Sequence, residues 1–90
     1  MILGRVVGRL WATRQAAGLA GRKLLLIRPE TASGTPADRL VVAVDGLSAG
    51  PGDRVLVAHG SRVRDLTVGP DVADKDIVIG IVDGHDLGTR

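Results

Sequence analysis

The sequence predicts an all-β protein, and three observations lead to that class. The apolar runs are short, rich in β-branched residues and bounded by turn formers, which is typical of strands. Several of these runs are apolar on both faces, so something must cover each face. The first run is interrupted by Gly4 and Gly8, a spacing that suits a sharply bent strand.

Composition indicates one small domain over residues 1–90 that needs help to be stable. A chain of 90 residues buries only about 60% of its unfolded surface. There is no cysteine, which excludes disulfides and thiolate metal sites, and His59 and His85 lie far apart in the sequence. Because 44% of the residues are hydrophobic and Trp11 is the only aromatic one, burial between subunits or in a tightly packed small barrel is expected.

Charge and hydropathy argue against nucleic-acid and membrane partners. The formal charge of +2 is spread along the chain, whereas nucleic-acid modules carry a basic stripe and often stacking rings. No apolar run is long enough for a membrane span, and the first ten residues lack the order of a signal peptide. A soluble, cytoplasmic protein is the expectation.

The first half of the chain predicts two strands and two loops. Residues 2–13 are predicted to form a curved strand; the four-residue spacing of Arg5 and Arg9 would also suit a helix, but the glycines and β-branched residues disfavour it. A connecting loop with a helical turn is predicted at 14–22, and a second strand at 23–28. Pro29 ends that strand, and residues 30–38 form a surface loop that tolerates change.

Residues 40–59 are predicted to form a β-hairpin with a long loop. The runs 40–44 and 55–58 supply its strands. Between them stand Gly46, Gly50, Pro51 and Gly52, whose backbone preferences give the loop a defined path.

After this hairpin the sequence predicts one helical turn and a last strand. Ser61 stands at an expected N-cap position ahead of a turn at 62–66. An irregular passage at 67–75 precedes a strand at 77–82 and a polar tail at 83–90. Five strands with one short helical turn fit a small closed barrel of the OB type.

Chemical motifs are weak. The glycine-rich loop at 48–53 is followed by a strand, whereas phosphate-binding glycine loops precede a helix, so no cofactor is expected there. His59 and Ser61 stand two apart on an extended segment with no sign of an oxyanion hole, so no catalytic residue is predicted. His85 and Asp86 fit a solvated tail better than a shared ligand or metal site.

Asp45 and Asp53 flank the loop of the predicted hairpin. Carboxylates in such positions hydrogen bond to nearby backbone amides and hold a loop in shape. They lack the companion features of an acid and base pair, so loop bracing is the predicted role of Asp45 and Asp53.

A resemblance to a known family covers nearly the whole chain. It rests on residues 4–8, Gly21, residues 23–26, Pro29, residues 42–45, Ala49, Gly50, Gly52, Asp53, residues 55–57, Gly60, Ser61, residues 77–78 and residues 80–83. In this order and spacing the chain resembles the EutN/CcmL family, the pentameric vertex proteins of bacterial microcompartment shells. Family members commonly carry glutamate where Asp53 stands, and Ser-Ser-Ala-Arg where residues 61–64 are Ser-Arg-Val-Arg.

The resemblance implies a barrel protomer that assembles into a cyclic homopentamer and caps the five-fold vertices of a polyhedral shell. Its expected partners are the hexameric shell proteins of the flat facets. The hypothesis for the ring axis is the loop Ser48, Ala49, Gly50 and Pro51, because a narrow opening accepts only short side chains. Arg62, Arg64 or the tail at 83–90 are the candidate contacts with facet proteins or a neighbouring subunit.

Two other functions stay open at this point. An OB-type barrel is also compatible with an oligonucleotide- or carbohydrate-binding module, although interleaved aromatic residues are absent. A hydrolase would have to use His59 and Ser61, and alanine at either position would test it.

Overall fold

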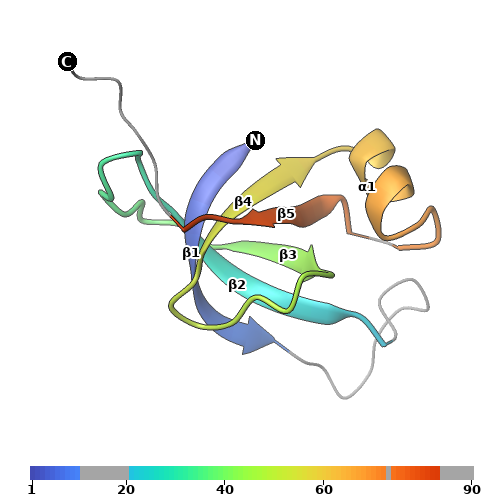
Figure 1. The fold of residues 1–90 in the computed structure, drawn as a ribbon, viewed down its shortest axis with the longest axis horizontal. Helices are drawn as coiled ribbons and strands as arrows, with labels where there is room; N and C mark the ends of the chain where they lie inside the picture. Colours follow the sequence, from blue (N-terminus) through green and yellow to red (C-terminus); the bar gives the residue numbers. More distant parts are fainter. Residues whose placement is uncertain (11–20, 73, 84–90) are drawn as a thin grey trace.

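The computed structural model describes residues 1–10, 21–72 and 74–83. It contains five strands and one helix: β1 (Ile2–Leu10), β2 (Lys23–Pro29), β3 (Val41–Asp45), β4 (Arg54–His59), α1 (Ser61–Thr67) and β5 (Asp76–Ile81) (Figure 1). The strands form a closed barrel in the order β1-β2-β3-β5-β4. The predicted fold class is therefore confirmed, and the strand bounds agree within a few residues at the ends described.

β1 bends in the way that its glycines predict. It pairs with β2 along most of its length and with β4 through its first half, and its register with β2 shifts between Val6 and Gly8. Gly4 faces the interior so closely that a Cβ atom there would lie 2.5 Å from Cγ2 of Ile27. The bulge and the missing side chain let one strand join two sides of the barrel. Residues 11–20, which include the end of the predicted strand and most of the following loop, lie outside the described residues.

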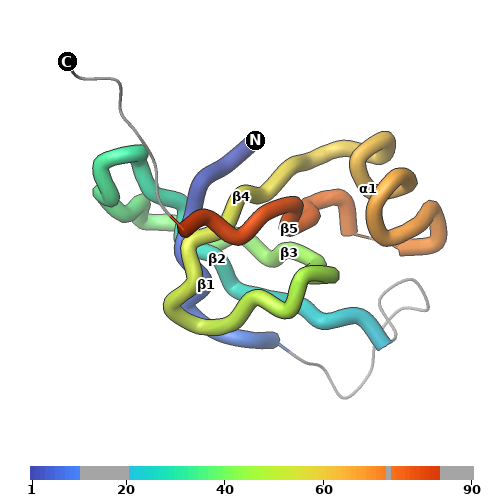
Figure 2. The backbone as a smooth tube through the Cα atoms, in the orientation of Figure 1, coloured from blue at the N-terminus to red at the C-terminus, as the bar shows by residue number. Residues whose placement is uncertain are grey.

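The predicted hairpin of residues 40–59 is wrong, because β3 and β4 are not neighbours. β5 lies between them, parallel to β3 and antiparallel to β4. The connection from β3 instead runs beside β1, where Gly52 N donates to Val6 O and Val6 N donates to Asp53 O, each at 2.8 Å. Figure 2 shows this connection sweeping around the barrel before β4 begins. Its length lets the two strands separate by one strand width.

The helix differs from its prediction in extent and in its cap. α1 begins at Ser61 and ends at Thr67, and its N-cap residue is Gly60, with φ 136° and no side-chain cap hydrogen bond. The Gly60 carbonyl accepts from Arg64 N at 3.1 Å. Ser61 is therefore the first helical residue and not the cap, because the chain must turn at a positive φ that favours glycine.

The core has two parts, one on each side of the sheet. The barrel interior holds Val6, Leu25, Ile27, Ala43, Ala49, Val55, Val57 and Val78. The second cluster contains Leu24, Val44, Val72 and Ile77, against which Val63 and Val68 of the α1 region pack. Neighbouring residues such as Leu24 and Leu25 thus point to opposite faces, as strand geometry requires. The sheet is apolar on both faces here because α1 and the segment after it cover its outer side.

Candidate functional site

The loop between β3 and β4 is held by the two carboxylates that flank it. Asp45 accepts hydrogen bonds from Leu47 N at 3.0 Å and from Ala49 N at 2.9 Å, and its side chain is fully buried. Asp53 accepts from Gly50 N at 2.9 Å. These bonds satisfy amides that the tight loop cannot pair with other backbone groups.

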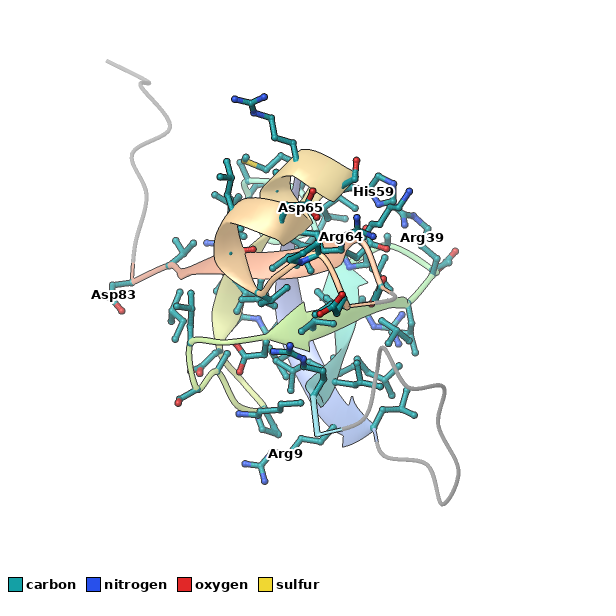
Figure 3. All side chains as sticks on the ribbon, turned by 90° about the vertical axis from the view of Figure 1, so that its right-hand side faces the viewer. Arg9, Arg39, His59, Arg64, Asp65 and Asp83 are labelled. Carbon is teal, nitrogen blue, oxygen red and sulfur yellow. The ribbon has the colours of Figure 1, made fainter. Side chains whose placement is uncertain are left out.

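Three cations from β1 and β2 surround this loop. Lys23 donates to the Ala49 carbonyl at 2.6 Å and lies 3.3 Å from Asp45 Oδ2. Arg5 donates to the Gly52 carbonyl at 3.0 Å. Arg9 reaches the same loop, because a Cβ atom on Gly50 would lie 3.9 Å from its Nη2. Figure 3 shows Arg9 projecting at the lower edge of the view, away from α1.

The side chains of the loop itself divide between the core and the surface. Ala49 is fully buried and belongs to the barrel core, so its methyl group is not available to line an opening. Ser48 and Pro51 are exposed and Gly50 is half-buried. Ser48 has φ 63°, a left-handed conformation that most residues avoid, and the Asp45 bonds on either side hold it there.

The two arginines of α1 lie in different surroundings. Arg64 donates to Asp65 Oδ1 at 3.0 Å and to the Val72 carbonyl at 3.4 Å, and its side chain is mostly buried. Arg62 is exposed and has no hydrogen-bond or ion-pair partner among the described residues. Figure 3 shows Arg64 beside Asp65 on the helix. Of the two, only Arg62 offers an uncommitted cation.

His59 and Ser61 do not form a catalytic pair within the described residues. His59 Nδ1 lies 2.8 Å from Asp76 Oδ1, and no hydrogen bond joins its ring to Ser61.

Next to the pair of His59 and Asp76, burial raises the pKa of Asp74 above its usual 3.8, and the charge of Asp76 adds to that effect. No group of three or more acidic, histidine or cysteine side chains able to hold a metal ion occurs in the described ranges. His85 and Asp86 lie outside them.

Sequence reasoning missed the basic partners of the loop and an ion network beside it. Glu30, almost fully buried, lies 2.6 Å from Arg54 Nε and 3.5 Å from Arg5 Nη2. Arg54 also donates to the carbonyls of Thr31 and Ala32, which fixes the loop after β2. The strand register is the signal that could have indicated one of these partners. Lys23 in β2 and Asp45 in β3 carry opposite charges and lie opposite each other once the two strands pair.

The comparison with protein families decides the relationship. The family model described as ethanolamine utilisation protein EutN/carboxysome matches residues 1–83. The chain belongs to the EutN/CcmL family. EutN/CcmL relatives of known role are similar over nearly their whole length. PduN of Salmonella typhimurium, a bacterial microcompartment shell vertex protein, is 41% identical over 87 residues, covering 92% of this chain and 96% of the relative. CcmL of Synechocystis, a carboxysome shell vertex protein, is 37% identical over 83 residues, covering 92% of this chain and 83% of the relative.

Solved structures of the EutN/CcmL family share the fold. CcmL of Gloeobacter violaceus superposes with a TM-score of 0.90 at 31% identity, covering 100% of this chain and 93% of that one. GrpN of Rhodospirillum rubrum, a pentameric microcompartment shell protein, superposes with a TM-score of 0.84 at 34% identity, covering 96% and 98%. As for membranes, the described part of this EutN/CcmL chain has no helix with the length and apolar character needed to span one.

Proposed function

We propose that this chain is a structural protein of a bacterial microcompartment shell, in which five copies close into a ring at a five-fold vertex. The observation that carries the proposal is membership of the EutN/CcmL family over residues 1–83, with several curated relatives named as shell vertex proteins. The pentameric GrpN structure, similar over 96% of this chain, supports the number of subunits. A ring of five introduces curvature that a flat hexagonal sheet lacks.

In this proposal the protein's role is geometric and it is not an enzyme. The relatives are named for their place in a shell and not for a reaction. The residues that could imitate a hydrolase have structural partners, since His59 pairs with Asp76 and Ser61 begins the helix.

The loop between β3 and β4 is proposed to approach the ring axis. Within residues 48–51 of this loop, the exposed Ser48 and Pro51 are small, and the half-buried Gly50 adds backbone without a side chain. The carboxylates of Asp45 and Asp53 fix the loop's path, which a narrow opening of constant width requires. Ala49 contributes to this loop from the core side alone.

Hexameric shell proteins of the flat facets are the proposed partners of the ring. Arg62 is the favoured contact, because its guanidinium is exposed and free of partners in the described part of the chain, whereas Arg64 is neutralised by Asp65. A charge-reversed Arg62→Glu variant should form the ring normally but reduce shell closure when co-expressed with facet proteins, as counted by electron microscopy. Equal numbers of closed shells from Arg62→Glu and the wild type would remove Arg62 from this role.

Native mass spectrometry of the purified chain tests the proposed function. A dominant species at five times 9.3 kDa is expected. A monomer as the main species at micromolar concentration would contradict the ring and favour a free-standing OB-type binding module.

A further inference from the structure

The outer surface of the barrel carries an apolar strip across β1, β2 and β3. Gly8, Leu26 and Val42 are neighbours in register on these three strands, and we call them strip A. The side chains of Leu26 and Val42 face outward because Leu25 and Ala43, their neighbours in β2 and β3, are fully buried in the interior. Val42 is 39% exposed and the nearby Leu40, 46% exposed, extends the strip. Strip A contains no polar side chain.

A second apolar strip lies across β1, β4 and β5. Leu3, Leu56 and Gly80 are neighbours in register there, and we call them strip B. Leu56 faces outward because Val55 and Val57 on either side of it are buried in the core. Strip B ends next to Ile81, which is 41% exposed. It too contains no polar side chain.

Each strip combines a leucine with a shallow space above a glycine. A Cβ atom on Gly8 would lie 3.9 Å from Leu26 Cδ1, and one on Gly80 would lie 3.8 Å from Leu56 Cβ. These are ordinary contact distances, so the protomer itself does not require glycine at either position. Each glycine leaves room beside a leucine for a side chain that comes from outside.

α1 and the segment after it, which cover part of the outer face of the sheet, do not extend over strip A or strip B. α1 and the following segment pack on Leu24, Val44 and Ile77, which precede or follow the strip residues along their strands. Leu26, Leu56 and Leu3 are left half-buried, with no described side chain packed over them from outside the sheet in either core cluster. Contiguous apolar surface of this kind marks an interaction site.

We propose that strip A of one subunit packs on strip B of the next, so that Leu26 of strip A lies over Gly80 and Leu56 of strip B lies over Gly8. This inference rests on the proposed ring, because a closed ring with one repeated contact needs two different surfaces on every subunit. The pentameric GrpN relative supports a second copy of the chain as the occupant. Both strips are three residues wide and wholly apolar, and each holds one glycine next to a leucine, so their surfaces match in chemistry.

The positions of the strips also suit a small ring. Strip A is centred on β2 and strip B on β4, and both strands adjoin β1 in the barrel order. In Figure 1, β4 runs along the upper side of the barrel and β2 along the lower side. Because only β1 separates β2 from β4 in the closed barrel, the two surfaces are less than a half-turn apart around it. The two neighbours of a subunit in a five-membered ring must also be less than a half-turn apart. The face of β1 between them, which carries Arg5, is turned toward the ring axis.

Three glycine substitutions test this contact with a matched control. Gly8→Glu alters strip A, Gly80→Glu alters strip B, and Gly46→Glu alters neither. A Cβ at Gly46 would lie 3.8 Å from Val68, and none of the three glycines has a positive φ, so the cost within the protomer is similar. Native mass spectrometry should show monomers for the two strip variants and a ring for Gly46→Glu and the wild type. Circular dichroism checks that every variant is folded.

Mixing the two strip variants tests the pairing itself. Gly8→Glu retains strip B and Gly80→Glu retains strip A, so together they should form a heterodimer that neither forms alone. Rings from both strip variants, a homodimer from either one alone, or loss of the ring in Gly46→Glu would each overturn the proposal. A wild-type monomer would instead refute the proposed function, so the two failures are distinguishable. If a glutamate variant proves unfolded, Gly8→Ser and Gly80→Ser replace the pair, with a weakened ring expected.

Discussion

Removal of the Asp45 carboxylate is expected to destabilise the protomer by about 3 kcal/mol. Two backbone amides donate to it, and hydrogen bonds to a buried charged acceptor contribute about 1.5–3 kcal/mol each. The ion pair with Lys23 adds about 1 kcal/mol or less, because the Lys23 side chain is 37% exposed. The lower end of these values is appropriate, since the carboxylate also loses its own hydration on burial.

Three variants at this position separate the contributions. Asp45→Ala removes all three contacts and should cost about 3 kcal/mol. Asp45→Asn keeps an oxygen that accepts from one backbone amide, but its NH2 group faces the second N–H and cannot accept from it. A loss of stability of about 2 kcal/mol is expected. Lys23→Met removes the ion pair and one hydrogen bond to the Ala49 carbonyl, and should cost only about 1 kcal/mol.

The assay is urea unfolding followed by circular dichroism at one fixed chain concentration, because association in the proposed ring adds stability that depends on concentration. The expected order of stability loss is Asp45→Ala, then Asp45→Asn, then Lys23→Met. A loss for Asp45→Ala of less than about 0.5 kcal/mol, the range of ordinary surface changes, would refute the reasoning that this carboxylate holds the loop.

Two further predictions concern the barrel wall and pH. Gly4→Ala should destabilise by about 1–3 kcal/mol, because its Cβ would press on Cγ2 of Ile27, whereas Gly46→Ala should have little effect; similar melting curves for both variants would contradict this. Asp74 has its pKa raised by burial and by Asp76, so its ionisation costs the folded state free energy and stability falls as pH rises from 3.8 through the raised value. Asp74→Asn should reduce that fall, as measured by urea unfolding at about pH 4 and about pH 7, and an unchanged pH dependence would argue against it.

The sequence predicted the strands well because their signal is local. β-branched residues between turn formers indicate a strand wherever its partners lie, and the bend of β1 followed from Gly4 and Gly8. Pairing is not local, so the sequence placed β3 beside β4 when β5 stands between them. Two apolar runs of similar composition carry no information about which neighbour each one takes.

The candidate site shows the same division between local and distant signals. Asp45 and Asp53 stand next to the loop whose amides they accept, and a sequence can indicate such short-range partners. Lys23 and Arg5 reach the loop from other strands, which only the register reveals. The inward side chain of Ala49 likewise depends on the path of the whole connection. The sequence indicated Ser61 as the N-cap, whereas the positive φ needed at the turn makes Gly60 the cap.

The pairing of β3 with β5 has a consequence for the order of folding. It is the only parallel contact in the described barrel and involves just two residue pairs, Val44 with Ile77 and Asp45 with Val78. β4 and β5 can pair early across residues 60–75, and β2 can pair with β3 across residues 30–40, because both separations are shorter than the one between β3 and β5. The parallel contact has to wait until both pairs exist, because closing a long loop costs entropy before any bond forms. We therefore expect the barrel to close last at the contact between β3 and β5. The backbone amides of this contact should be among the first in the barrel to exchange their hydrogens with solvent.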